Sequence, residues 1–450
     1  MKRRTALGAA GLLLGSGCLG DASTPSESIS DSDGDGVIDS QDYAPKDPNV
    51  SEKADLSSPT TSGTPITTAR PTTQRPTTTT EYPTTETATR TTVRTPPPTT
   101  AVPHGNTLSV DSHPELGSQV VEYGYRSVTA RIDPDGPAVE DTLAGESAKL
   151  VVGTYRYPDG DAVAFGESEP VTLSETKTLS VEVEYDASIP RDTRLNHLGL
   201  LIPGEKSIDE VESSEVAHFH ETDPFVVDEN NDIERSLSSD TPGDDAGETY
   251  ERRAIEGAYS LDFQGVTLGR QWSVNFFIYK RAYEAAVQEP RGRSRSEYVT
   301  YAREEGFGRE VASILVDEIT ANGFTDKREQ VEFVIDFVQG LPYVPDEVSK
   351  GYDDYTKFLS ETLVEAGGDC EDSAILLTSV LQSEPFGYDM VLFELPGHMA
   401  AGIYGSDDMT GTYVESDGRR YYYIETTGTG WGVGDIPETY QDERVWTHQV

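Results

Sequence analysis

The chain has 450 residues, 26% of them charged, and its formal net charge is −45 at pH 7. Its length exceeds that of one typical domain. So much negative charge repels phosphate groups, which argues against nucleic acid or an anionic membrane face as the main partner. An excess of acid keeps a protein hydrated where salt screens repulsion, so we predict a halophilic source, with an ordinary acidic exported protein as the alternative.

Residues 1–17 have the features of an export signal. Arg3 and Arg4 precede an apolar run from Leu7 to Leu14, which is too short to span a bilayer permanently. Paired arginines indicate the twin-arginine route. Cys18 follows small residues, and this context resembles a lipoprotein processing box. We therefore predict a lipid on Cys18 that anchors the chain at the extracellular face of the cell membrane; a cleaved signal without a lipid is the alternative.

Residues 18–50 contain an acidic stretch with the spacing of a calcium-binding loop. Acids stand at loop positions one, three, five, nine and twelve, with glycine at position six; they are Asp31, Asp33, Asp35, Asp39 and Asp42. Oxygen ligands at this spacing wrap a hard cation. The stretch resembles a thrombospondin type 3 calcium repeat, which implies a structural Ca²⁺ site. A solvated acidic spacer is the alternative.

Residues 51–104 consist mostly of Thr, Pro and Ser. They lack the apolar side chains that offset the entropy cost of ordering, and proline keeps such chains extended. We predict a disordered stalk that lifts the following domains off the surface.

Residues 105–228 alternate short apolar runs with turn residues. Strands are predicted at residues 150–152, 155–157, 179–183 and 197–202, with a turn signal at residues 158–161. The pattern favours a small β-sandwich of the immunoglobulin-like type. An acidic linker is predicted at residues 229–249.

Residues 250–450 mix helical and strand patterns. Strands at 259–263 and 272–277 precede helical apolar stripes at 311–319 and 331–338. An almost entirely apolar helix begins at Cys370, and such a helix belongs in the middle of a domain. Four more strands are predicted at 390–395, 398–404, 412–415 and 420–425. This order predicts an α+β fold.

Cys370 is the centre of the predicted chemistry. A Gly367-Gly368 turn delivers it to a helix N-terminus, where the helix dipole favours a thiolate. The chain has two cysteines, and Cys18 lies in the export signal, so the mature protein offers Cys370 no intramolecular disulfide partner. A cysteine on a helix, His398 on one strand and Glu425 on a later strand can converge as nucleophile, base and orienting acid.

Four segments carry a resemblance to a known group of enzymes. Residues 367–372, 396–398 and 422–427, together with the segment at 337–343, are similar to the transglutaminase-like cysteine hydrolase superfamily, in particular its prokaryotic surface members. The resemblance extends over roughly residues 250–436. It implies a papain-like α+β core and a Cys370–His398–Glu425 triad. The third member is more often Asp in that superfamily. Gln339 is a candidate oxyanion donor, with a surface helix residue as the alternative.

Three acids crowd the cysteine: Asp369, Glu371 and Asp372. Their negative charge raises the pKa of a thiol. Asp369 and Asp372 also stand at the two positions of a capping box, which would turn their carboxylates toward the helix backbone. A bound cation is another possibility, because some members of the superfamily hold calcium with acids that flank the cysteine.

The function predicted from these residues is acyl transfer on a protein or peptide substrate at the cell surface. His398 would take the Cys370 proton, and the sulfur would form a thioester acyl-enzyme. Water would make the protein a peptidase or amidase; an amine acceptor would make it a cross-linking transglutaminase. A non-catalytic adhesin or scaffold is the third possibility. No cofactor is predicted for the chemistry itself.

Overall fold

The computed structural model of the protein describes residues 67–69, 105–113, 117–136, 139, 143–211, 215–239, 241–351, 354–406 and 409–450. Helices and strands are both present, and the strands form several sheets, in agreement with the predicted α+β class. Cys18, the five acids of the calcium-like repeat and most of the predicted stalk lie outside the described residues. Within the described part, no helix is long and apolar enough to cross a membrane.

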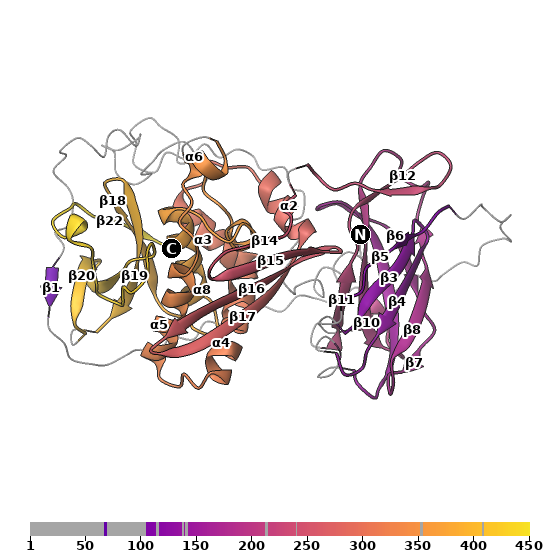
Figure 1. The fold of residues 1–450 in the computed structure, drawn as a ribbon, viewed down its shortest axis with the longest axis horizontal. Coiled ribbons are helices and arrows are strands. Elements are labelled where there is room, and N and C mark those ends of the chain that lie inside the picture. The colour runs from indigo at the N-terminus through magenta and orange to yellow at the C-terminus, as the bar shows by residue number, and fades with distance from the viewer. Residues whose placement is uncertain are drawn as a thin grey trace.

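Two sheets build the first lobe (Figure 1). A four-stranded sheet has the order β2 (Leu108–Ser109), β3 (Gln119–Gly124), β4 (Ser127–Ile132) and β8 (Lys177–Glu182). The other sheet has the order β13 (Ile233–Arg235), β12 (Phe225–Val227), β10 (Leu195–Pro203), β5 (Ser147–Arg156), β6 (Ala162–Glu167) and β9 (Glu184–Tyr185). In addition, β11 (Ala217–Glu221) pairs with β10, and β7 (Val171–Thr172) pairs with β5.

The two sheets share one apolar core. Val128, Ala130 and Ile132 are buried at every second position of β4, as a strand with one buried face requires. Leu150 and Val152 of the other sheet belong to the same cluster. The two sheets thus enclose a common apolar core, in agreement with the β-rich region expected here.

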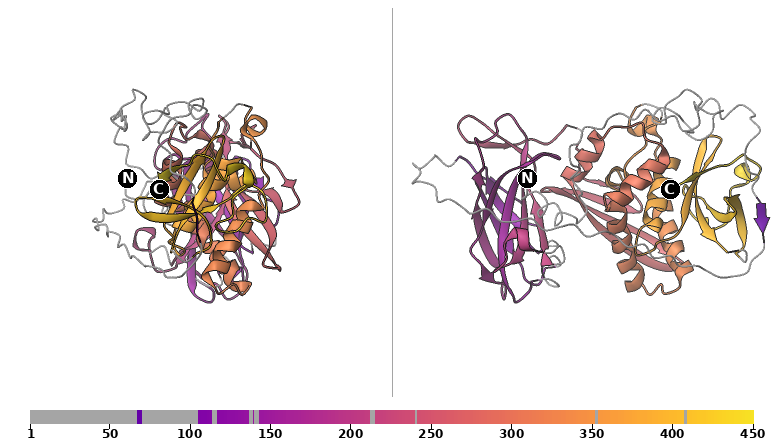
Figure 2. Two further views of the ribbon diagram at one scale, coloured as in Figure 1. Left: turned by 90° about the vertical axis from the view of Figure 1, so that its left-hand side faces the viewer. Right: turned by 180° about the vertical axis from the view of Figure 1, so that it is seen from behind.

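The second lobe places helices between a hairpin sheet and a C-terminal sheet (Figure 2). The hairpin sheet has the order β14 (Asp245–Ala246), β15 (Tyr250–Ile255), β16 (Ala258–Thr267) and β17 (Arg270–Tyr279). The helices are α2 (Lys280–Gln288), α3 (Arg295–Glu304), α4 (Phe307–Ala321), α5 (Lys327–Gln339), α6 (Asp346–Ser349), α7 (Leu359–Val364) and α8 (Cys370–Gln382). The C-terminal sheet has the order β1 (Thr67–Ala69), β20 (Gly411–Ser416), β21 (Arg419–Ile424), β19 (His398–Gly405), β18 (Met390–Leu395) and β22 (Trp446–Gln449).

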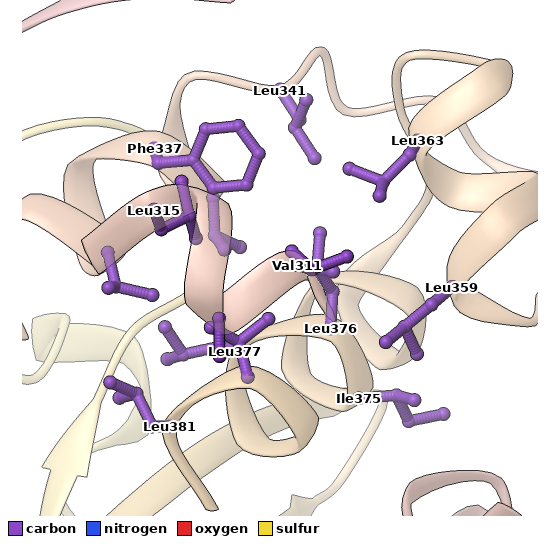
Figure 3. Packing of buried hydrophobic residues seen from close by; sticks show 14 of the residues in the cluster. Val311, Leu315, Phe337, Leu341, Leu359, Leu363, Ile375, Leu376, Leu377 and Leu381 are labelled. Carbon is purple, nitrogen blue, oxygen red and sulfur yellow. The ribbon is translucent and has the colours of Figure 1, made fainter. Parts of the chain in front are cut away.

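Helix α8 lies at the centre of this lobe. Every residue from Asp372 to Leu381 is buried. The helix contacts α3, α4, α5 and α7 as well as strands β18 and β19. Figure 3 shows its leucines packed among side chains of the neighbouring helices, including Val311, Leu315 and Phe337. The predicted position of this helix is therefore confirmed, and its N-terminus is set against the sheet that carries His398.

Several predictions of local structure need correction. The strands predicted at 150–152 and 155–157 are one continuous strand, β5, because its pairing with β10 runs through both. The acidic linker contains two short strands, β13 and β14, which pair with β12 and β15. Within the predicted stalk, β1 pairs antiparallel with β20. Helices α2, α3, α6 and α7 were not predicted; each has at most 10 residues, which is too short for a clear apolar periodicity.

Buried ion pairs join the two lobes along α2. The Lys280 ammonium lies 2.7 Å from the Asp223 carboxylate, and the Arg281 guanidinium lies 2.9 Å from the Glu221 carboxylate. Glu284 receives hydrogen bonds from first-lobe side chains as well. Removing one partner of a buried pair would leave an uncompensated charge, which is costly.

Candidate active site

The turn before Cys370 needs glycine for steric reasons. A Cβ atom on Gly368 would lie 2.6 Å from Cβ of Asp372. The Gly368 carbonyl accepts a hydrogen bond from the Val344 N–H at 2.8 Å, which ties the turn to the segment after α5. Cys370 is thereby held at the first position of α8 with its side chain partly exposed.

The Cys370 sulfur makes two hydrogen bonds. Its thiol donates to Oε2 of Glu371 at 3.2 Å, and it accepts a hydrogen bond from the Met399 backbone N–H. Met399 directly follows His398 at the start of β19, so the sulfur lies beside the strand that begins with the predicted base.

His398 and Glu425 form a buried pair. Nε2 of His398 lies 3.0 Å from Oε2 of Glu425, and both residues are buried. Oε2 also accepts from the Tyr423 hydroxyl, while Oε1 accepts from the backbone N–H groups of Thr426 and Thr427 and from the Thr427 hydroxyl. Five donors therefore hold this carboxylate in place. Because Nε2 of His398 contacts Glu425, the other ring nitrogen, Nδ1, faces away from Glu425.

The hydrogen bonds also set the charge of Glu425. Burial alone would raise the pKa of its carboxyl group. The hydrogen bonds from His398 and Thr427, together with the His398 charge, lower this pKa overall. The carboxylate is thus ionised at neutral pH, as an orienting acid must be to stabilise an imidazolium.

Gln339 holds the loop after Glu425. Its Nε2 donates to the Glu425 carbonyl at 2.8 Å and to the Trp431 carbonyl at 2.9 Å, and its Oε1 accepts from the Gly430 N–H at 3.0 Å. Both amide hydrogens are used by these carbonyls. No hydrogen remains for an oxyanion, so we assign Gln339 the positioning of the loop in place of the predicted oxyanion contact.

The surroundings of Cys370 favour the thiol over the thiolate. Burial and the charges of Glu371 and Asp369 raise the pKa of the Cys370 thiol far above its usual range, and the Met399 N–H opposes them only in part. The helix dipole was expected to favour the thiolate. Its effect is outweighed because the carboxylates are closer to the sulfur than most of the helix.

The predicted capping box does not form. Asp369 stands at the N-cap of α8, but its side chain makes no capping hydrogen bond. Asp372 instead accepts from the Lys357 backbone N–H at 2.7 Å, and the Lys357 ammonium lies 3.4 Å from its second oxygen. Burial and the Glu371 and Asp372 charges raise the pKa of Asp369 to about 9, while burial raises that of Asp372 to about 7 against the opposing Lys357 charge.

Three buried carboxylates converge next to the cysteine. Asp346, Asp369 and Asp372 each offer an oxygen, and these atoms lie within 4.8 Å of one another. Oδ1 of Asp346 and Oδ1 of Asp369 are buried and have no hydrogen-bond partner, whereas Oδ2 of Asp372 has the Lys357 ammonium at 3.4 Å. Buried carboxylate oxygens without donors are costly, and a hard cation is the group that such a set of oxygens fits.

Two residues near Cys370, Asp346 and Lys357, were not predicted from the sequence. Asp346 lies on α6 and Lys357 precedes α7, so neither is close to Cys370 in the chain. The only sequence signal for Asp346 was its place just after the 337–343 segment that resembles the superfamily. His448 lies in β22, with its Nε2 atom 2.6 Å from Oε2 of Glu394.

Two cavities lie away from this site. One, of about 410 Å³, lies between the lobes and is lined by Tyr157, Ala286, Phe358 and neighbouring residues. The other lies at the β16–β17 hairpin and includes Trp272. Neither is lined by Cys370, His398 or Glu425.

Comparisons with protein families, with curated proteins and with solved structures found no match to this chain.

Proposed function

We propose that the protein is a cysteine hydrolase, a peptidase or amidase, that uses Cys370, His398 and Glu425 on protein substrates. The observation that carries the proposal is the buried 3.0 Å contact between His398 and Glu425 beside the helix that begins with Cys370. The packing of α8 against an antiparallel sheet supports the further proposal of a papain-like core. The resemblance to transglutaminase-like hydrolases points to the same chemistry.

The proposed reaction is acyl transfer through a thioester. His398 accepts the thiol proton as the Cys370 sulfur attacks the amide carbonyl carbon, and the carbonyl electron pair moves to oxygen. Backbone N–H groups at the start of α8 stabilise this oxyanion. The C–N bond then breaks, and His398 returns the proton to the leaving amine. Water attacks the thioester, gives its proton to His398, and releases the acid as the sulfur is reprotonated.

The place of action is part of the proposal. The basic start, the apolar run and Cys18 support export and a lipid anchor, and the Thr/Pro-rich segment supports a stalk. The acidic repeat at Asp31–Asp42 supports a structural Ca²⁺ site at the base of that stalk. The enzyme would then act on proteins at or near the surface of the same cell.

A cation beside Cys370 is a separate proposal. Asp346, Asp369 and Asp372 would hold a divalent cation, most simply Ca²⁺, through one carboxylate oxygen each. When bound, the ion would offset the negative charge that surrounds the Cys370 sulfur. The three carboxylates themselves would then be fixed in position around the first turn of α8.

Alkylation of the cysteine tests the nucleophile. The full-length chain is treated with iodoacetamide near neutral pH, and mass spectrometry follows the peptide that contains Cys370, so that Cys18 does not interfere. A His398→Ala variant should react at least about tenfold more slowly if His398 activates the sulfur. Equal rates for the two proteins would contradict the proposed function.

Surface proteomics tests the reaction type. Cells that produce the natural protein are compared with cells that produce a Cys370→Ser variant. New protein termini that depend on Cys370 support hydrolysis. Cross-links or incorporation of an added primary amine, without new termini, would show transamidation instead, and no difference at all would favour a scaffold.

A further inference from the structure

Tyr440 covers one face of the His398 imidazole. The two ring centroids are 4.4 Å apart and the ring planes differ by only 2°. Tyr440 is the last residue of η5, a short 3-10 helix at Glu438–Tyr440. Within the described part of the chain, Tyr440 is the aromatic residue that stacks on His398.

The position of the Tyr440 ring is supported by its surroundings. Its backbone N–H donates to the Pro437 carbonyl at 2.9 Å, and its carbonyl accepts from the Glu443 N–H at 3.2 Å. The side chain packs against a buried apolar cluster of the C-terminal sheet that includes Leu395 and Val445. The ring is therefore held by packing rather than left free at the surface.

The stack and the hydrogen bond to Glu425 restrain the imidazole in two different ways. The hydrogen bond holds one edge of the ring through Nε2, and the stack holds its plane. A rotation about the Cβ–Cγ bond would break both contacts. The face of an aromatic ring is also electron-rich, so it stabilises a cationic imidazolium above it.

We propose that Tyr440 is a positioning residue that holds the His398 ring in its plane for proton exchange with Cys370. The proposal rests on the proposed function. It depends on the aromatic face of Tyr440 and not on its hydroxyl group. A phenylalanine at position 440 should therefore preserve the reactivity of Cys370, whereas an aliphatic residue of similar volume should reduce it.

Two variants and a matched control test the proposal. Tyr440→Phe keeps the stacked ring, and Tyr440→Leu removes it while retaining apolar volume. Tyr404→Leu is the control, because Tyr404 packs against the same apolar cluster and its ring contacts Tyr421, at an interplanar angle of 60°, instead of His398. The rate of Cys370 alkylation should fall about tenfold in Tyr440→Leu and stay within about twofold in the other two proteins.

The NMR signals of the His398 ring protons give a readout that does not depend on activity. They are assigned by their loss in His398→Gln, and a stacked ring shifts them upfield. Tyr440→Leu should remove this shift, and Tyr440→Phe should keep it. An unchanged alkylation rate in Tyr440→Leu would overturn the proposal, as would an equal loss in Tyr440→Phe. If His398→Ala itself alkylates at the natural rate, the proposed function fails first, independently of Tyr440.

Discussion

Nε2 of His398 lies 3.0 Å from Oε2 of Glu425, a residue 27 positions later in the chain. His398 opens β19, and Glu425 directly follows the last residue of β21, its antiparallel neighbour. The contact thus joins the start of β19 to the end of β21, two interior strands of the sheet. The start of β19 also lies beside the first turn of α8, since the Met399 N–H donates to the Cys370 sulfur.

The Glu425→Gln variant should lose most of the reactivity of Cys370. The amide keeps the shape of the side chain but removes the charge that stabilises the His398 imidazolium, so we expect at least about a hundredfold loss of hydrolysis. Glu394→Gln is a matched control for the loss of a buried carboxylate, because Glu394 pairs with His448 and not with His398. Equal losses in the two variants would mean that Glu425 acts on stability alone.

His197 in the first lobe should make the fold sensitive to acid. Its Nε2–H donates to the Gly124 carbonyl at 2.8 Å, and its Nδ1 accepts from the Thr154 hydroxyl at 2.9 Å. Burial lowers the pKa of His197 to about 4. In the unfolded chain a histidine titrates near pH 6.5, so between about pH 6.5 and 4 the unfolded state binds more protons. The free energy of unfolding should therefore fall as the pH drops through this window, by about 3 kcal/mol at its lower end.

Urea unfolding followed by far-UV circular dichroism at pH 7.5 and 4.5 measures this effect. His197→Gln cannot take up a proton, so its difference in free energy between the two pH values should be smaller than that of the natural protein. The variant is expected to be less stable at pH 7.5, because it loses a buried contact. A pH dependence identical to that of the natural protein would exclude His197 as its source.

The cluster of the Asp346, Asp369 and Asp372 carboxylates predicts stabilisation by a divalent cation. Saturating Ca²⁺ at about a hundred times its dissociation constant should raise the free energy of unfolding by about 2.7 kcal/mol, and a chelator should reverse the change. Thermal unfolding of the natural protein and of Asp346→Asn measures it. Asp389→Asn, in a surface pair with Arg419, should behave like the natural protein. A Ca²⁺ effect that survives Asp346→Asn would place the ion elsewhere, for example at Asp31–Asp42.

Gln339 should stabilise the loop that follows Glu425. Gln339→Ala removes buried hydrogen bonds to the Glu425 and Trp431 carbonyls and to the Gly430 N–H, so we expect a loss of about 2–3 kcal/mol together with slower Cys370 alkylation. Gln330→Ala on the same helix serves as control, because Gln330 is only part-buried and donates to one carbonyl. If alkylation is unchanged in a folded Gln339→Ala protein, the loop does not position Glu425.

The order of the elements around Cys370 could be predicted from the sequence alone. The strand at Met390–Leu395 and the start of α8 at Cys370 agree with the prediction, because apolar periodicity and glycine turns are local signals. The same signals placed His398 and Glu425 on two strands, and the resemblance to transglutaminase-like hydrolases implied that the two residues pair. Each lies at a strand end, and adjacent antiparallel strands bring such ends together.

Other features were decided only by the tertiary structure. Asp346 meets Asp369 and Asp372 because α6 folds back over the turn before α8, and no periodicity in the chain encodes that contact. The pKa of the Cys370 thiol depends on burial and on which way the neighbouring carboxylates turn, so the sequence left open whether the helix dipole or the three acids would prevail. Local patterns determine which helix or strand a residue belongs to. Long-range packing determines which side chains meet and how deeply they are buried from solvent.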